Sequence, residues 1–377
     1  MAKSNKNIYL DYAASVLPNP SSIHSAGVLA KNKLESSRTI VASVLSAHKD
    51  EIIFTSGATE SNNLAIQGVV LASSFFPHII TTNIEHPSVL ETFKLLEKRK
   101  LAEISIVPVE ENGIVNPKKI KKEIKENTIL VSVMYANNEI GTIQPIKEIA
   151  KEIRHYNKTN HKKVLFHTDA VQAVNYLDLN VERLGVDLLS ISGAKIEDSG
   201  RVGLLYKKRN VSLANVFGGG DQEMGLRPGT ENLQEIIKFS SALKKIQDVK
   251  EKENKRLTKL RDYFVQKIIK NFGEFSVLVN GDLENRLPNN INITFPKIPS
   301  DLLMIELSAK GIMASSKSAC KSSKAEGSYV IKAIRPEADL EIGGLRFSLG
   351  RDTKKSDIDY TIKTLSVILQ KLKKWYY

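Results

Sequence analysis

The sequence predicts an α/β protein with a mostly parallel sheet, helices on both faces of that sheet, and a smaller α+β domain. Between residues 15 and 206, short apolar runs rich in β-branched residues alternate with helical patterns, which is typical of parallel-sheet proteins. After Tyr206 this alternation stops. A chain of 377 residues is long enough for two domains. We expect a large domain at 15–240 and a small domain formed by 1–14 and 241–377.

The first part of the chain predicts the start of the sheet and a turn that suits a phosphate. We expect an extended segment at 8–14, a Ser-capped helix within 21–45 and a strand at 51–55. That strand runs directly into SGATESNNLAIQ, a Gly-containing turn followed by an amphipathic helix. The N-terminus of a helix carries free backbone N–H groups, which bind phosphate. Ordinary α/β turns have the same pattern, so this signal alone is weak.

Three further strand–loop–helix units follow, with the strands HIITT, ISIVPV and ILVSV. His86 lies in the loop after the first strand, with Pro87 at a typical first helical position. Asn137, Asn138 and Glu139 follow the third strand. Repetition of this unit predicts parallel strands joined by helical crossovers.

The stretch 164–206 carries the residues that point most directly to a chemistry. Its apolar runs at 164–166 and 186–191 predict two buried parallel strands, followed by Asp169 and Lys195. Ligands of open α/β sheets lie beyond the carboxyl ends of the strands. An acid and a lysine there suit pyridoxal phosphate (PLP), since the lysine forms a Schiff base and the acid pairs with the pyridinium nitrogen. A turn aspartate and a surface lysine are the alternative.

The remainder of the chain predicts the smaller domain. A Gly-rich loop at 216–234 leads into a Lys- and Glu-rich helix that ends near Asn271. Short strands in SVLVNG, INITF and LRFSL, an apolar helix at 302–309 and a terminal helix follow. This order differs from the repeated units of the first part and indicates an α+β arrangement.

Composition narrows the class of protein. The net charge of +13 comes mostly from lysines on helical faces without interleaved aromatic residues, which favours a solvated surface over a nucleic-acid site. Acidic protein partners are compatible with it. We expect no membrane span and no secretion signal, because no apolar run has the required length. The single cysteine excludes an internal disulfide and indicates a reducing compartment, hence the cytoplasm.

The single cysteine, Cys320, lies in a segment that predicts reactivity. The segment ASSKSACKSSKAEGS contains no apolar run, which is typical of an exposed loop. Lys317 and Lys321 would favour the thiolate form. Cys320 is therefore a candidate nucleophile or sulfur carrier, and a small buried hydrophobic residue is the alternative.

The sequence resembles the class V, fold-type I PLP enzymes, and within them the cysteine desulfurases that supply sulfur for iron–sulfur clusters. The resemblance follows the family's order along nearly the whole chain. It implies the fold-type I PLP-transferase fold, and the cysteine segment resembles the longer-loop group, which passes sulfur to a scaffold protein. The matching stretches are IYLDYAA, NPSSIHSAG, EIIFTSGATESNNLAI, EHPSVL, NNEIG, FHTDAVQA, SGAK, GGGDQEMGLRPGTEN, SSKSACKSS and LRFSLGR.

The resemblance implies a set of contacts to the cofactor ring. Lys195 would hold PLP as a Schiff base, and Asp169 would pair with the pyridine nitrogen, which keeps the ring electron-accepting. Gln172 would donate a hydrogen bond to the phenolic oxygen. His86 would stack on the ring and transfer protons. Asn138 would contact cofactor or substrate near the phenolic side.

Further contacts implied by the resemblance concern the phosphate and the substrate. Ala58 and Thr59 would bind phosphate through the helix N-terminus, with the hydroxyl of Ser192 added. Thr230 would reach the phosphate of a neighbouring subunit, so the family implies a homodimer. Arg346 would bind the substrate carboxylate.

The implied activity is removal of sulfur from L-cysteine, which gives L-alanine and a persulfide on Cys320. Iron–sulfur scaffold proteins and other acceptors would receive the sulfur, with tRNA thiolation as a further destination. The resemblance implies no resident metal, although Cys320 would transiently ligate a partner's iron–sulfur cluster, and no nucleic-acid or membrane partner. The alternatives are a selenocysteine lyase or an aminotransferase of the same fold, or a scaffold protein without catalysis.

The chain departs from the family pattern at the N-terminus and around Lys195. Only VLP separates IYLDYAAS from NPSSIHSAG, where the family carries about twenty more residues. Ala194 replaces the usual phosphate-binding histidine, EDSG at 197–200 replaces a GPKG-like turn, and Asp221 is an extra loop residue. Loss of one charge-assisted phosphate contact weakens cofactor binding by about 1.5–3 kcal/mol.

Overall fold

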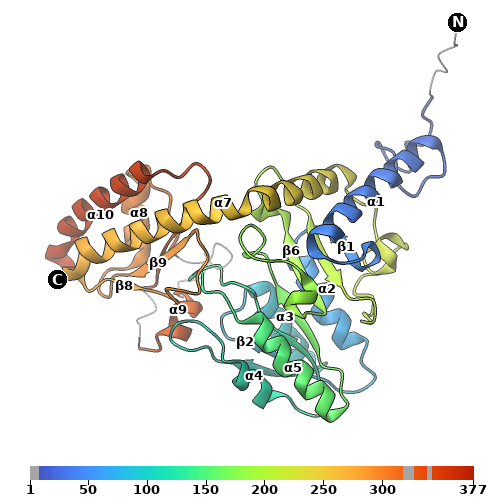
Figure 1. Ribbon diagram of the computed structural model, residues 1–377, viewed down its shortest axis with the longest axis horizontal. Coiled ribbons are helices and arrows are strands. Elements are labelled where there is room, and N and C mark those ends of the chain that lie inside the picture. Colours follow the sequence, from blue (N-terminus) through green and yellow to red (C-terminus); the bar gives the residue numbers. More distant parts are fainter. Residues whose placement is uncertain (1–7, 317–326, 338–341) are drawn as a thin grey trace, which may run out of the picture.

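The computed structural model describes residues 8–316, 327–337 and 342–377. Within these ranges the larger part is built on a seven-stranded sheet of order β1-β7-β6-β5-β4-β2-β3 (Figure 1). All its strands run in one direction except β7, which is antiparallel to both of its neighbours. The strands are β1 (Ile52–Thr55), β2 (His78–Thr82), β3 (Glu103–Val107), β4 (Thr128–Ser132), β5 (Leu165–Asp169), β6 (Leu188–Ser192) and β7 (Gly203–Lys207).

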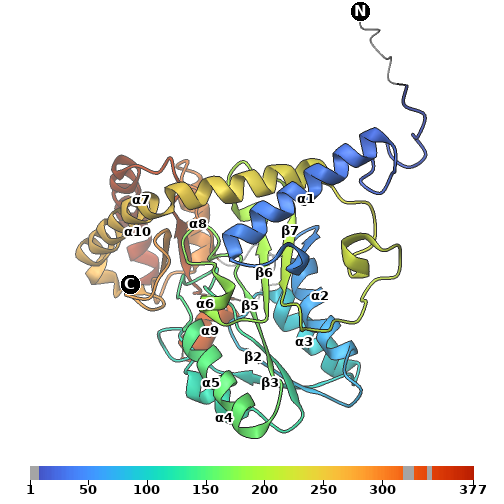
Figure 2. The same cartoon turned by 45° about the vertical axis from the view of Figure 1, so that its right-hand side comes forward.

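Helices cover both faces of this sheet, because successive side chains of a buried strand point to opposite faces. Ile53 packs with α2 (Ala58–Leu71) and α3 (Pro87–Lys98), whereas Ile52 and Phe54 pack into the core on the other face. The predicted layers are therefore confirmed (Figure 2). The core that contains Ile52 and Phe54 also includes residues of α1 (Ser25–Leu45), α4 (Pro117–Glu123), α5 (Ile146–Asn160), α6 (Val181–Leu184) and α7 (Leu233–Phe272).

The long helix α7 joins the large part of the molecule to the small one. Phe239 and Leu243 pack in the large core, whereas Phe264 and Ile268 pack in a separate core at the other end of the helix (Figure 1). That core lies between α7 and a three-stranded antiparallel sheet of order β10-β9-β8. The elements are β8 (Leu278–Val279), β9 (Asn290–Thr294), α8 (Ser300–Ser308), β10 (Leu345–Ser348) and α10 (Lys355–Tyr376), with α9 (Tyr329–Ile334) packed on the large core.

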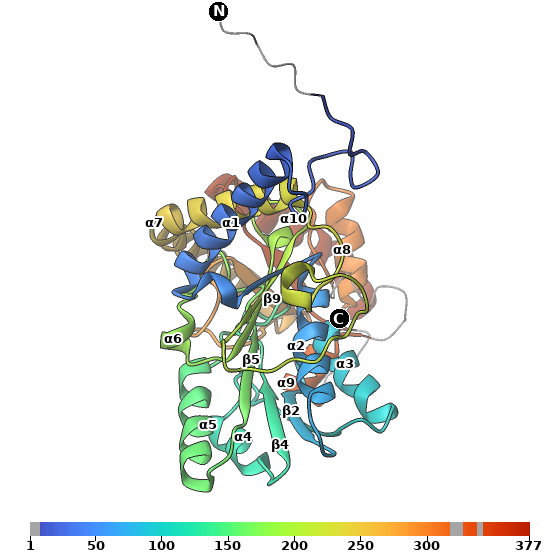
Figure 3. The same cartoon turned by 90° about the vertical axis from the view of Figure 1, so that its right-hand side faces the viewer.

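The N-terminal segment lies beside the start of α1 (Figure 3). Asp11 accepts hydrogen bonds from the Ser22 hydroxyl at 2.9 Å and from His24 Nε2 at 3.2 Å. Both contacts join the segment to residues 22–24, and the expected membership of 1–14 in the small domain stays a prediction. The expected boundary at residue 240 lies inside α7.

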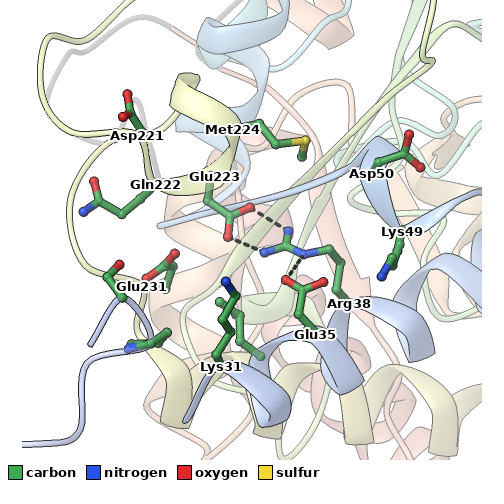
Figure 4. A pocket seen from close by; sticks show the side chains of 13 residues that line it. Lys31, Glu35, Arg38, Lys49, Asp50, Asp221, Gln222, Glu223, Met224 and Glu231 are labelled. Carbon is green, nitrogen blue, oxygen red and sulfur yellow. Dashed lines mark hydrogen bonds and ion pairs between the residues drawn. The ribbon is translucent and has the colours of Figure 1, made fainter. Parts of the chain in front are cut away.

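A buried ion pair fixes the Gly-rich loop to α1 and β1 (Figure 4). Arg38 donates from Nη1 and Nη2 to the two carboxylate oxygens of Glu223, both at 2.8 Å. Their side chains are 8% and 1% exposed. The Phe54 N–H also donates to Glu223, and Arg38 donates to the Ile52 carbonyl oxygen. Each charged side chain thus forms hydrogen bonds with a backbone group as well as with the other side chain.

The described residues contain neither a membrane-spanning helix nor a metal-binding cluster. No helix in these ranges has an apolar stretch long enough to span a bilayer. No group of three or more His, Cys, Asp or Glu side chains in the same ranges is placed to hold a metal ion. At the carboxyl ends of the parallel strands, the chain instead forms a cavity that contains titratable side chains.

We predict that Arg38→Met lowers the free energy of unfolding by about 3–5 kcal/mol, because the buried carboxylate of Glu223 loses its partner. Equilibrium unfolding in urea measures the loss. Lys255→Met is the matched control, since it removes an exposed pair with Glu251, and we expect it to change stability by less than ~1 kcal/mol. Equal losses in both variants would contradict the role of the buried pair.

Candidate active site

The candidate active site is a cavity of about 630 Å³, a size typical of small-molecule sites. Asp169 is the last residue of β5, Ser192 is the last residue of β6, and Lys195 ends a single helical turn directly after it. His86 caps α3 in the loop after β2. Parallel strands end at one edge of the sheet, so residues far apart in the sequence meet there.

The cavity brings together most of the residues that the sequence singled out. The predicted residues that line it are Ala58, Thr59, His86, Asn138, Asp169, Gln172, Ser192, Lys195 and Arg346. Thr230 does not line it and lies in an adjoining smaller cavity. Cys320 lies outside the described residues.

Asp169 is held in place by donors on two sides. Its Oδ2 accepts a hydrogen bond from Asn62 Nδ2 at 2.8 Å, and its Oδ1 accepts one from the Val171 N–H at 3.0 Å. The residue is 5% exposed. A carboxylate has more lone pairs than these two bonds use. Asp169 can therefore accept a further hydrogen bond from a ring N–H in the cavity.

His86 presents a neutral imidazole to the cavity. The Ser88 N–H donates to its Nδ1 at 3.1 Å, and the Ser88 hydroxyl lies 2.8 Å from the same atom. Because a backbone N–H can only donate, Nδ1 is an acceptor and the ring proton is on Nε2. Burial lowers the pKa of His86, the charge of Lys195 adds to this, and the charge of Asp169 opposes it. The Nε2–H is therefore the proton that the neutral ring can give to a group in the cavity.

The cavity also contains a partly buried cation with unused hydrogen-bonding capacity. Arg346 Nη1 donates to the Asn138 carbonyl oxygen at 2.8 Å. Arg346 Nε and Asn138 Oδ1 are buried without a partner among the described residues. Burial lowers the pKa of Arg346, but a guanidinium stays charged at neutral pH. This open donor and open acceptor suit a carboxylate or amino-acid ligand.

The start of α2 supplies the donors for a phosphate. The N–H groups of Ala58 and Thr59 open the helix, and no acceptor among the described residues takes them. β7 approaches the turn closely, since a Cβ at Gly203 would collide with the backbone of Gly57. The methyl of Ala194 offers no polar contact here. The residues present thus fit a ligand with a phosphate, a ring nitrogen and a carbonyl that reacts with Lys195.

Among the residues that the sequence did not single out, Ser88 and Arg201 line the cavity, and Asn62 bonds to Asp169 from outside the lining. Asn62 is fully buried although it follows a polar stretch, and only the packing of α2 against β5 reveals its bond to Asp169. Ser88 follows His86 and Pro87, so a capping pattern at the start of α3 was the available signal. Arg201 lies in a loop with no periodic pattern.

The family model described as Aminotransferase class-V matches residues 2–361 of the chain. The chain belongs to the class V aminotransferase family. Among class V relatives, it is 42% identical over 386 residues to "Cysteine desulfurase IscS" of Dictyoglomus turgidum, covering 98% of this chain and 96% of that protein. It is 39% identical to the protein of the same name from Methanosarcina thermophila, covering 99% of this chain and 94% of that one.

Solved structures agree with this class V assignment. One titled "NIFS-LIKE PROTEIN" superimposes with a TM-score of 0.85 at 33% identity, over 93% of this chain and 91% of its own. A NifS-like protein from Rickettsia africae gives a TM-score of 0.82 at 28% identity, with coverages of 96% and 94%. The predicted fold-type I fold is confirmed, and the protein is a PLP-dependent class V enzyme of the IscS type.

Glu85, next to His86, is a buried acid with an unusual protonation equilibrium. Its carboxylate accepts hydrogen bonds from the Met134 N–H and from the Thr82 hydroxyl. Burial raises the pKa of Glu85 to about 8, and these hydrogen bonds only partly oppose the effect. In the unfolded chain the same group titrates near 4.5.

We therefore predict that the free energy of unfolding contains a contribution from Glu85 that decreases as pH rises from 4.5 to about 8. Over this range the folded protein binds a proton that the unfolded chain has lost. The contribution to the free energy of unfolding therefore falls by up to ~1.4 kcal/mol for each pH unit. Urea unfolding across the range measures it, and Glu85→Gln should flatten the curve. Glu97→Gln, on α3, is the control. Parallel curves for the parent and Glu85→Gln would contradict the prediction.

Proposed function

We propose that this protein is a cysteine desulfurase, which transfers the sulfur of L-cysteine to Cys320 and releases L-alanine. The observation that carries the proposal is the cavity in which Lys195, Asp169 and His86 meet at the end of the sheet. The similarity to proteins named cysteine desulfurase over nearly the full chain supports the choice of substrate.

PLP, when bound, supplies an electron-accepting ring that stabilises negative charge on the substrate α-carbon. Asp169, fixed by Asn62, would accept a hydrogen bond from the ring nitrogen, and Lys195, whose side chain has no partner among the described residues, would attach the cofactor through its amine and return a proton to the substrate α-carbon. Arg346 orients the substrate through its carboxylate. His86 Nδ1 is blocked by Ser88, so only its Nε2 exchanges a proton with the reacting groups.

The sulfur step needs Cys320 near the substrate. The thiolate attacks the substrate sulfur, the carbon–sulfur bond breaks, and a sulfur–sulfur bond forms on Cys320. The electron pair of the broken carbon–sulfur bond stays on the carbon that carried the sulfur, and this carbon takes up a proton, which gives the methyl group of alanine. No external oxidant or reductant is therefore required.

The chain on both sides of the cysteine segment is attached next to the cavity, which supports this role. Ser315 exchanges two backbone hydrogen bonds with Arg346, at 3.1 and 2.7 Å. After the segment, the Ser328 hydroxyl donates to Glu139, and the Tyr329 hydroxyl donates to the Glu85 carbonyl oxygen. Cys320 follows Ser316 by four residues, which span at most ~14 Å.

The proposal extends to the assembly and the cellular role. We propose a homodimer in which Thr230 contributes to the phosphate site of the neighbouring subunit, and a cytoplasmic location. Iron–sulfur scaffold proteins and other sulfur acceptors would take the persulfide sulfur. Support for these points comes from the similarity to IscS-named proteins and from the position of Thr230 outside its own cavity.

Two alternatives predict different outcomes. An aminotransferase or a selenocysteine lyase of the same fold does not require a persulfide on Cys320. A scaffold protein that has lost PLP requires neither Lys195 nor bound cofactor. Single-turnover persulfide formation and the visible spectrum of the purified protein separate these possibilities.

We predict that Cys320→Ala lowers alanine formation from cysteine at least ~100-fold, because the acceptor of the substrate sulfur is removed. Alanine and protein-bound persulfide are measured in the same reaction. Ser322→Ala, in the same segment, should keep both, and PLP binding should be equal in all three proteins. Full persulfide and sulfide output from Cys320→Ala would show that the assigned role is wrong.

We predict that the protein with PLP absorbs at about 400 nm and that Lys195→Ala abolishes this band, because the Schiff base to the lysine is lost. Absorbance spectra and reduction with borohydride followed by mass spectrometry measure the adduct. Lys238→Ala, on the exposed face of α7, is the control and should keep the adduct. An unchanged band in Lys195→Ala would rule out this lysine, and a parent protein without the band would favour the scaffold alternative.

A further inference from the structure

The cavity leaves one cation without an assigned role. Among the described residues, the Lys and Arg side chains that line it are Lys195, Arg201 and Arg346. Lys195 attaches the cofactor under the proposed function. Arg346 donates to the Asn138 carbonyl oxygen and would bind the substrate carboxylate under the same proposal. Arg201 is therefore the cation that is available for a second anionic group.

Strand pairing places Arg201 next to the phosphate-binding turn. β7 begins at Gly203, which pairs with Thr55, the last residue of β1. Gly203 also touches the backbone of Gly57, where α2 begins. Arg201 precedes Gly203 by two residues, so the chain passes the N-terminus of α2 at this position. Consistently, Arg201 lines the cavity together with Ala58.

The loop that carries Arg201 packs against α7, whereas the Arg201 guanidinium is available for a ligand. Gly200, the neighbour of Arg201 in the chain, lies against the Glu235 carboxylate of α7, because a Cβ at this position would collide with it. No hydrogen bond or ion pair among the described residues involves the Arg201 side chain. The nearby Arg227, in contrast, donates to Glu60 at 2.8 Å. Arg227 is thus already paired, whereas Arg201 is available.

We propose that Arg201 binds the phosphate of PLP, together with the N–H groups of Ala58 and Thr59. This inference rests on the proposed cofactor site at Lys195. The planar guanidinium forms two parallel hydrogen bonds with phosphate oxygens, and a charged donor binds more strongly than a neutral one. It supplies the side-chain donor that Ala194, with only a methyl group, does not provide.

The test compares PLP with pyridoxal, which forms the same Schiff base but has no phosphate. Dissociation constants are measured for the full-length parent, Arg201→Ala, Arg201→Lys and the control Arg183→Ala, which removes the exposed pair of Arg183 with Asp178. Arg201→Ala should weaken PLP binding about 10- to 100-fold and leave pyridoxal binding unchanged. Arg201→Lys should recover part of the PLP affinity, since lysine keeps the positive charge but lacks the paired N–H donors of the guanidinium. Adding Ala194→His to Arg201→Ala should also recover part of it.

Three results would overturn the inference. Equal PLP binding by the parent and Arg201→Ala would remove Arg201 from the phosphate site. An equal loss of PLP and pyridoxal binding would indicate a structural role, such as pairing with Glu231, whose buried Oε2 lacks a partner among the described residues in the adjoining cavity. A parent protein that forms no Schiff base with either compound would overturn the proposed function as well, and this outcome is distinct from the other two.

Discussion

The arrangement of the site depends on one buried amide. Asn62 on α2 donates to Asp169 at the end of β5 and to the Ser88 hydroxyl on α3, both at 2.8 Å. Ser88 in turn fixes the acceptor nitrogen of His86. Buried polar networks of this kind impose a single arrangement because each member needs its partners. The turn that begins α2, the acid and the histidine are therefore positioned by the same side chain.

The sequence predicted the parts of this structure that depend on local pattern. Buried β-branched runs marked the strands, and the rule that ligands lie at the carboxyl edge pointed to Asp169 and Lys195. Both residues line the cavity, as do His86 and Arg346. The role of Arg346 came from the resemblance, because its place in a second domain at the far end of the chain gives no local signal.

The remaining features depend on contacts between distant segments. β7 pairs antiparallel with β1 and β6, and a strand's direction is not encoded in its apolar pattern. Asn62 occupies a helix position that a solvent-exposed polar residue could equally occupy. Arg201 is placed by the register of β7, which no single segment determines. Thr230 lies outside the cavity, so the phosphate contact proposed for it would come from a second chain.

The continuous helix α7 has a consequence for protein engineering. Its forty residues contribute to both cores, so a chimera cut near residue 240 would leave unpaired backbone carbonyls and amides at two new helix ends and expose an apolar stripe. The small domain is therefore a poor module for transplantation between homologues. The short stretch between Ser316 and Ser328 is the better unit for grafting, because an exchange there leaves the shared helix intact and keeps the flanking bonds of Ser315 to Arg346 and of Ser328 to Glu139.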